Sequence, residues 1–175
     1  MENKEILVED NHNDELHNTH TNWVLWAHLP HDTNWEETSY KKIYTIKSLE
    51  EAITLVHTLP DKLIKNCMLF VMREGIKPMW EDEQNRNGGC FSYKVNNKQI
   101  IQCWSSLLYK LVCENLTCKE KNTLSINGLT ISPKRNFCIV KLWLKNCDLK
   151  DPYEIKQIIG LPQNGCLFKK HNPCY

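Results

Sequence analysis

The stretch CFSYKVNNKQIIQCWSSLLYKLVC, residues 90–113, decides the fold class because it joins two element types. Residues 90–95 form a strand pattern. Residues 100–113 then place their apolar side chains at helical spacing, with Trp104 among them. A strand that leads into an amphipathic helix predicts a domain that mixes strands and helices.

Further strand patterns lie on both sides of this stretch. Apolar side chains on both faces predict a strand that starts at Trp23. Asn127 and Gly128 stand between the segments 124–126 and 129–131, which begin and end with apolar residues, and this indicates a short hairpin at that point. The other predicted strands are residues 40–46, 67–73, 138–144 and 166–171.

Two further helices are predicted from their end signals. Ser48 with Glu51 three residues later is a capping-box pattern, and the helix that follows ends before residue 60. An Asp-Pro start favours a helix over residues 151–159, closed by a glycine. Antiparallel strands interrupted by three helices make the predicted fold class α+β.

Length and charge limit the organisation of the chain and its classes of partner. With 175 residues, we expect a flexible N-terminal tail over residues 1–20 and one domain over residues 21–175. Lys and Arg number 22 against 21 Asp and Glu, a net charge of +1. A protein that grips duplex nucleic acid through many phosphates shows a basic excess, so any nucleic-acid contact here must be local.

Nine cysteines raise the question of disulfides, metal binding and nucleophilic chemistry. The N-terminus lacks the apolar run of a signal peptide, so we expect a cytoplasmic protein with reduced cysteines and no membrane span. There is no CxxC pair, and the histidines between residues 17 and 31 lie in loop-like sequence, so no metal site is predicted. A cysteine-dependent hydrolase stays open as an alternative at Cys90, although the sequence identifies no base for it.

Two tryptophans stand in polar loop sequence, Trp35 in NWEE and Trp80 in MWEDE. Such residues either anchor neighbouring loops or form an aromatic pair that stacks on a planar ligand. A cationic ring suits such a pair because aromatic faces are negative. The Glu81 carboxylate can accept hydrogen bonds from adjacent donors, such as N1–H and N2–H2 of guanine. A guanine methylated at N7 carries the positive charge that favours both contacts.

The segment GIKPMWEDE, residues 75–83, followed by Asn85 and a Gly-Gly pair, strongly resembles the cap-binding loop of the eukaryotic translation initiation factor 4E family. Trp23–Trp26, Cys103-Trp104 and the segment FKKH at 168–171 resemble further family segments. The resemblance implies a curved antiparallel sheet of about eight strands, with three helices on the convex face and a cap slot on the concave face. It also implies a non-catalytic protein without a cofactor that binds capped mRNA in translation initiation, and we expect a monomer.

The resemblance assigns the cap base to four residues. Trp35 and Trp80 would sandwich the 7-methylguanine ring, and Glu81 would read its N1 and N2 edge. Trp143 would touch the methyl group on N7.

The phosphate chain of the cap would meet a smaller basic set than the family pattern provides. Lys134 takes the place of a phosphate-gripping arginine, but Cys90 and Ile139 stand where many members have basic residues. The resemblance also places the end of the chain before a C-terminal loop that adds triphosphate contacts. Because Lys141 lies two residues from the predicted methyl contact and so on the same strand face, we expect it to bind phosphate with Lys134, and Arg135 as a third cation.

The partner-binding surface departs further from the family pattern. Family scaffold and inhibitor proteins lay an amphipathic helix across the convex face, around a tryptophan whose place Ile53 takes here. Ser105 and Tyr109 also depart from the pattern, and His17 alone remains of a His-Pro-Leu motif. We therefore expect cap binding to persist and binding of initiation factor 4G or a 4E-binding protein to be weak. The alternative function is a cap-binding translational repressor or decoy that does not recruit the initiation scaffold.

Overall fold

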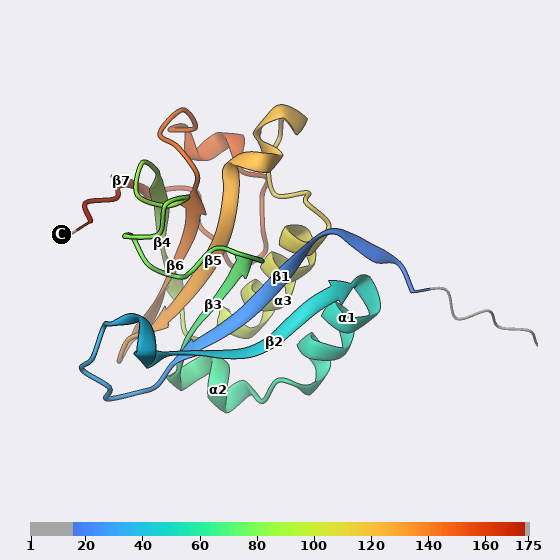
Figure 1. The fold of residues 1–175 in the computed structure, drawn as a ribbon, viewed down its shortest axis with the longest axis vertical. Coiled ribbons are helices and arrows are strands. Elements are labelled where there is room, and N and C mark those ends of the chain that lie inside the picture. Colours follow the sequence, from blue (N-terminus) through green and yellow to red (C-terminus); the bar gives the residue numbers. More distant parts are fainter. Residues whose placement is uncertain (1–15, 174–175) are drawn as a thin grey trace, which may run out of the picture.

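The computed structural model describes residues 16–173, which form one antiparallel sheet with helices on one face (Figure 1). The sheet has seven strands in the order β2-β1-β3-β5-β6-β4-β7, and every neighbouring pair is antiparallel. The predicted α+β class is therefore confirmed, with seven strands in the described range rather than about eight. The strands are β1 (Asn18–His28), β2 (Tyr40–Ser48), β3 (Met68–Arg73), β4 (Gly89–Asn96), β5 (Ile126–Pro133), β6 (Phe137–Leu144) and β7 (Leu167–Lys170).

Three α-helices gather on one side of the sheet (Figure 1): α1 (Leu49–Thr58), α2 (Asp61–Asn66) and α3 (Ile100–Val112). The predicted capping box begins α1, because the Ser48 side chain accepts a hydrogen bond from the Glu51 backbone N–H. One face of α3 is buried over its whole length, with Trp104 fully enclosed. Burial of this apolar face fixes the helices to the sheet.

The two faces of the sheet carry different clusters of side chains. Alternate residues of the strands join the helices in the main core, as Phe91 of β4 and Leu142 of β6 do. The opposite, concave face carries a smaller cluster of Phe70, Met72, Ile76 and Trp143. The loop residue Trp80 packs against this second cluster. The concave face is therefore the one on which large aromatic side chains meet a loop.

Several predicted elements are wrong in position. Asn127 and Gly128 do not turn a hairpin: both lie inside β5, at an irregularity in its register with β6. A Cβ atom at Gly128 would lie 2.3 Å from the Val71 carbonyl oxygen, so close strand approach explains the glycine. The first strand begins at Asn18, within the segment expected to be a tail, while residues 1–15 lie outside the described range.

The helix expected over residues 151–159 is also wrong. Only a single 3₁₀ turn, Pro152–Glu154, follows the Asp151 cap. Ile155 and Ile158 are buried in the main core from an irregular segment, and Ile155 forms an isolated bridge with Thr117. Their spacing of three residues therefore matches a helix without forming one. The third helix is α2, a short segment without a predicted signal of its own.

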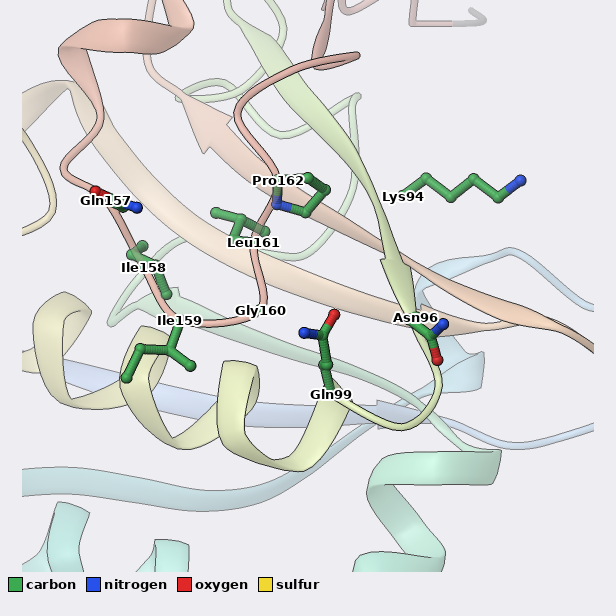
Figure 2. Close-up of a pocket in the computed structure, with 9 residues that line it drawn as sticks. All are labelled: Lys94, Asn96, Gln99, Gln157, Ile158, Ile159, Gly160, Leu161 and Pro162. Atoms are coloured by element: carbon green, nitrogen blue, oxygen red, sulfur yellow. The ribbon is translucent and has the colours of Figure 1, made fainter.

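A hollow lies where the sheet edge is incomplete. β7 pairs with β4 only as far as Ser92, so the rest of β4 has no neighbour on that side. The segment 157–162 passes beside this edge and leaves a cavity of about 650 Å³, lined by amide and apolar side chains and by Lys94 (Figure 2). Among the described residues, no helix is long and apolar enough to cross a membrane.

Candidate functional site

A cavity of about 470 Å³ opens on the concave face between two loops and the strands β5 and β6. Its volume lies in the range of small-molecule sites. One wall comes from the β1–β2 connection and the other from the β3–β4 loop, while the sheet provides the floor. Six residues predicted from the sequence line it together: Trp35, Trp80, Glu81, Lys134, Lys141 and Trp143. Arg135 is not among the lining residues.

The β1–β2 connection presents Trp35 with one face covered. The His28 ring stacks on Trp35, with centroids 4.1 Å apart and planes 7° apart. His28 is itself fixed, since its Nε2 donates to the Asn34 carbonyl oxygen at 2.8 Å. Trp35 remains 56% exposed, so it is not a buried anchor for its loop.

The β3–β4 loop is built around the buried side chain of Asn85. Its amide donates to the carbonyl oxygens of Lys77 at 2.8 Å and Met79 at 2.9 Å. Its carbonyl oxygen accepts from the Asn127 amide at 3.0 Å, and that amide also donates to the Gln84 carbonyl. Hydrogen bonds from Asn85 therefore hold the loop that carries Trp80 and Glu81 in one conformation, and hydrogen bonds from Asn127 connect this loop to β5.

His171 supports Trp80 from the end of the chain. The two rings stack with centroids 5.6 Å apart and planes 16° apart, and the Trp143 ring lies 5.0 Å from His171. His171 Nδ1 donates to the Asn85 carbonyl oxygen at 2.7 Å. On the floor, Trp143 Nε1 donates to Thr130 Oγ1 at 2.7 Å, which fixes the indole orientation.

Charges of both signs meet at the cavity. Burial, and then the negative charge of Glu81, raise the pKa of Tyr40, which lines the same cavity. The Lys141 ammonium lies over the Trp80 ring, 5.9 Å from its centroid. Burial lowers the pKa of His171, which favours its neutral imidazole. The site can therefore hold a planar ring with a cationic, hydrogen-bond-donating edge and an anionic substituent.

Comparisons with known proteins agree with this arrangement. The family model described as eukaryotic initiation factor 4E matches residues 18–174. The chain belongs to the eukaryotic initiation factor 4E family. It is 26% identical to translation initiation factor 4E of Saccharomyces cerevisiae over 176 residues, which cover 94% of this chain and 80% of the relative.

Solved structures of family members share the fold. The complex of Ascaris suum eIF4E-3 with m7G cap superposes with a TM-score of 0.68 at 25% identity, covering 78% of this chain and 77% of that one. Caenorhabditis elegans eIF4E-3, in complex with the 4E-binding protein Mextli and a cap analog, gives 0.66 at 27% identity, with 75% of each chain covered.

The convex face holds a second hollow, an apolar groove of about 400 Å³ between α1 and α3. Ile53 and Tyr109, two of the predicted partner-face residues, line this groove together. His17 lies at the start of α1, where its Nδ1 bonds a Glu50 carboxylate oxygen at 2.7 Å, and Ser105 bonds the Ile101 carbonyl within α3. Neither His17 nor Ser105 lines the groove.

Proposed function

We propose that this protein binds the 7-methylguanosine 5′ cap of mRNA in translation initiation, without catalysing a reaction. The observation that carries the proposal is the cavity that Trp35 and Trp80 line with Glu81 between the two loops. Family membership supports it, and the Ascaris suum relative was solved with m7G cap.

Each side chain has a role that follows from its chemistry. Trp35 and Trp80 each have a histidine on one face, and the other face can stack on the base. Base stacking on an aromatic side chain contributes about 1–3 kcal/mol, and a cationic base adds attraction to the negative ring face. The Glu81 carboxylate accepts from N1–H and N2–H2 in a charge-assisted pair. Trp143 on the floor would contact the N7 methyl group.

The phosphate chain requires cations next to the base. Lys134 and Lys141 line the cavity and would neutralise the first phosphates. Arg135 lies in the β5–β6 turn outside the lining, so its contact would be with phosphates further along the chain. These attractions weaken with added salt because they replace condensed counterions.

The remaining alternatives have less support. Burial raises the pKa of the Cys90 thiol, which is 1% exposed, so a thiolate nucleophile at this position is disfavoured. The relatives are named as translation initiation factors, which favours that role over a repressor or decoy. A cytoplasmic location belongs to the proposal.

Retention on immobilised 7-methyl-GTP tests the proposal. We expect the protein to bind the resin and to be released by free 7-methyl-GTP but not by the same concentration of GTP. Release by both nucleotides alike would contradict recognition of the methylated base. Trp80→Ala should abolish retention while leaving the circular dichroism spectrum unchanged, because Trp80 belongs to the loop and not to the main core.

A further inference from the structure

Three lysines follow one another along the concave face of the sheet, and we call them the lysine row: Lys169 of β7, Lys141 of β6 and Lys94 of β4. In the register, Cys90 pairs with Trp143 on one side and with Lys169 on the other. Two residues further along β4, Ser92 pairs with Lys141, and Lys94 itself follows after two more. Lys169 therefore lies across β4 from the floor tryptophan of the cavity.

The lysine row lies on the same face as the cavity. Phe91, Tyr93 and Val95 point into the main core, so Cys90, Ser92 and Lys94 must face the other way. Cross-strand partners share a face, which places Lys169 and Lys141 on the concave side as well. Lys141 and Lys169 both oppose the effect of burial on the pKa of Cys90, so their charges lie near that thiol.

The strands that carry the row offer it no opposite charge. The strands β4, β5, β6 and β7 contain no aspartate or glutamate. Among the ion pairs found in residues 16–173, none involves Lys94, Lys141 or Lys169. Among the residues that line the cavity, Glu81 of the β3–β4 loop is the acidic one. The chain has a net charge of only +1, but its positive charge is locally concentrated along the lysine row.

We propose that the lysine row is a track for the phosphate chain of a capped RNA, which rests on the cap-binding function proposed above. Lys169 and Lys141 bind the triphosphate, and Lys94 binds a phosphate of the nucleotides that follow. Lys94 lies four residue steps along β4 from Cys90, about 13 Å, which carries the chain away from the base.

The end of the track is also suited to RNA. The Lys94 ammonium lies 4.6 Å over the Phe137 ring, which holds it on the concave face. In Figure 2, the Lys94 side chain extends away from the segment 157–162, and Asn96 and Gln99 border the edge cavity beside it. A single strand leaving the cap slot along β4 would thus reach amide groups that can hydrogen-bond to bases.

The test compares single charge removals on two ligands, 7-methyl-GTP and a capped RNA of eight nucleotides, with affinities measured over a series of salt concentrations. Lys170→Gln is the matched control, because Lys170 is exposed on the same strand as Lys169 but alternates to the other face. We expect Lys169→Gln to weaken binding of both ligands about three- to fivefold. Lys94→Gln should weaken only the capped RNA. Each lost contact should flatten the salt slope for RNA by about 0.7.

The outcomes separate this inference from the proposed function. If the unaltered protein binds 7-methyl-GTP but Lys169→Gln and Lys94→Gln behave like Lys170→Gln, the track is wrong and cap binding stands. If Lys94→Gln weakens 7-methyl-GTP as much as the capped RNA, its assignment to the later phosphates is wrong. If the unaltered protein does not bind 7-methyl-GTP, both the function and the track are overturned.

Discussion

Asn85 touches no part of the proposed ligand, yet its replacement by alanine should damage cap binding. The side chain is 0% exposed and makes three hydrogen bonds, two as donor within its own loop and one as acceptor from Asn127. Each buried group that loses its hydrogen bond to Asn85 costs about 1–3 kcal/mol of folding free energy. Lys77 is exposed, so water can enter the loop there and replace part of the lost hydrogen bonding. We expect Asn85→Ala to lower the free energy of unfolding by about 2–4 kcal/mol.

This loss should leave the protein folded, because domains of this size are stable by about 5–15 kcal/mol. With a urea slope of about 1–3 kcal/mol/M, the midpoint should fall by roughly 1–2 M at an unchanged slope. Because an unfastened loop presents Trp80 and Glu81 in the binding geometry only part of the time, the affinity for 7-methyl-GTP should fall at least about tenfold.

Urea unfolding followed by circular dichroism and tryptophan fluorescence quenching by 7-methyl-GTP measure the two effects. Asn87→Ala is the control, because Asn87 is an exposed asparagine of the same loop. The control should match the parent in both assays. An Asn85→Ala protein with the parent's midpoint and the parent's affinity would refute the idea that this network holds the cap loop.

Three further outcomes are expected. Glu81→Gln should weaken 7-methyl-GTP at least about tenfold in a fluorescence titration with the urea midpoint unchanged, since one charge-assisted edge contact is lost; equal affinity would remove Glu81 from the edge role. Burial lowers the pKa of His171, so the unfolded chain takes up a proton below about pH 6.5 that the folded chain does not, and stability falls with acidification. His171→Gln should therefore lose less stability between pH 7 and pH 5 than the parent, measured by urea unfolding at each pH, and parallel curves would contradict this. A peptide with the helical motif of initiation factor 4G should bind weakly in a titration, and Ile53→Trp should tighten it about thirtyfold by restoring a large anchor in the α1–α3 groove; submicromolar binding by the parent would show that Ile53 suffices.

The elements of the fold that depend on local sequence signals could be predicted. The Ser48 cap, the apolar stripe of α3 and most strands follow from spacing and end residues, and all are confirmed. Asn127-Gly128 misled because the same dipeptide that suits a tight turn also suits a close approach between β5 and β3. The helix predicted after Asp151 was wrong because its Asp-Pro start also suits the single 3₁₀ turn Pro152–Glu154 that forms there.

The candidate site was predictable where residues act through their own chemistry. Trp35, Trp80 and Glu81 were named from their own chemistry and Trp143 from the family resemblance, and one cavity joins all four. Residues that support the site from a distant strand or loop could not be recognised from the sequence around them. His171 is far from Trp80 in sequence, and only the fold stacks the two rings.

The basic residues show the same limit. The apolar residues Cys90 and Ile139 suggested a weakened phosphate site. The strand register places Lys169 directly opposite Cys90 and Lys94 directly opposite Ile139. Register between distant strands depends on the whole sheet, so this arrangement of charge could not be read from the chain alone.

The close packing at Gly128 predicts that substitutions at this interior position affect the cap-binding loop as well as the core. Any side chain there would collide with the Val71 backbone and push β5 away from β3. The neighbouring Asn127 amide, which ties β5 to the cap loop, would move with the strand. Substitutions at residue 128 should therefore impair cap recognition as those at Glu81 do, and should also lower abundance as core variants do.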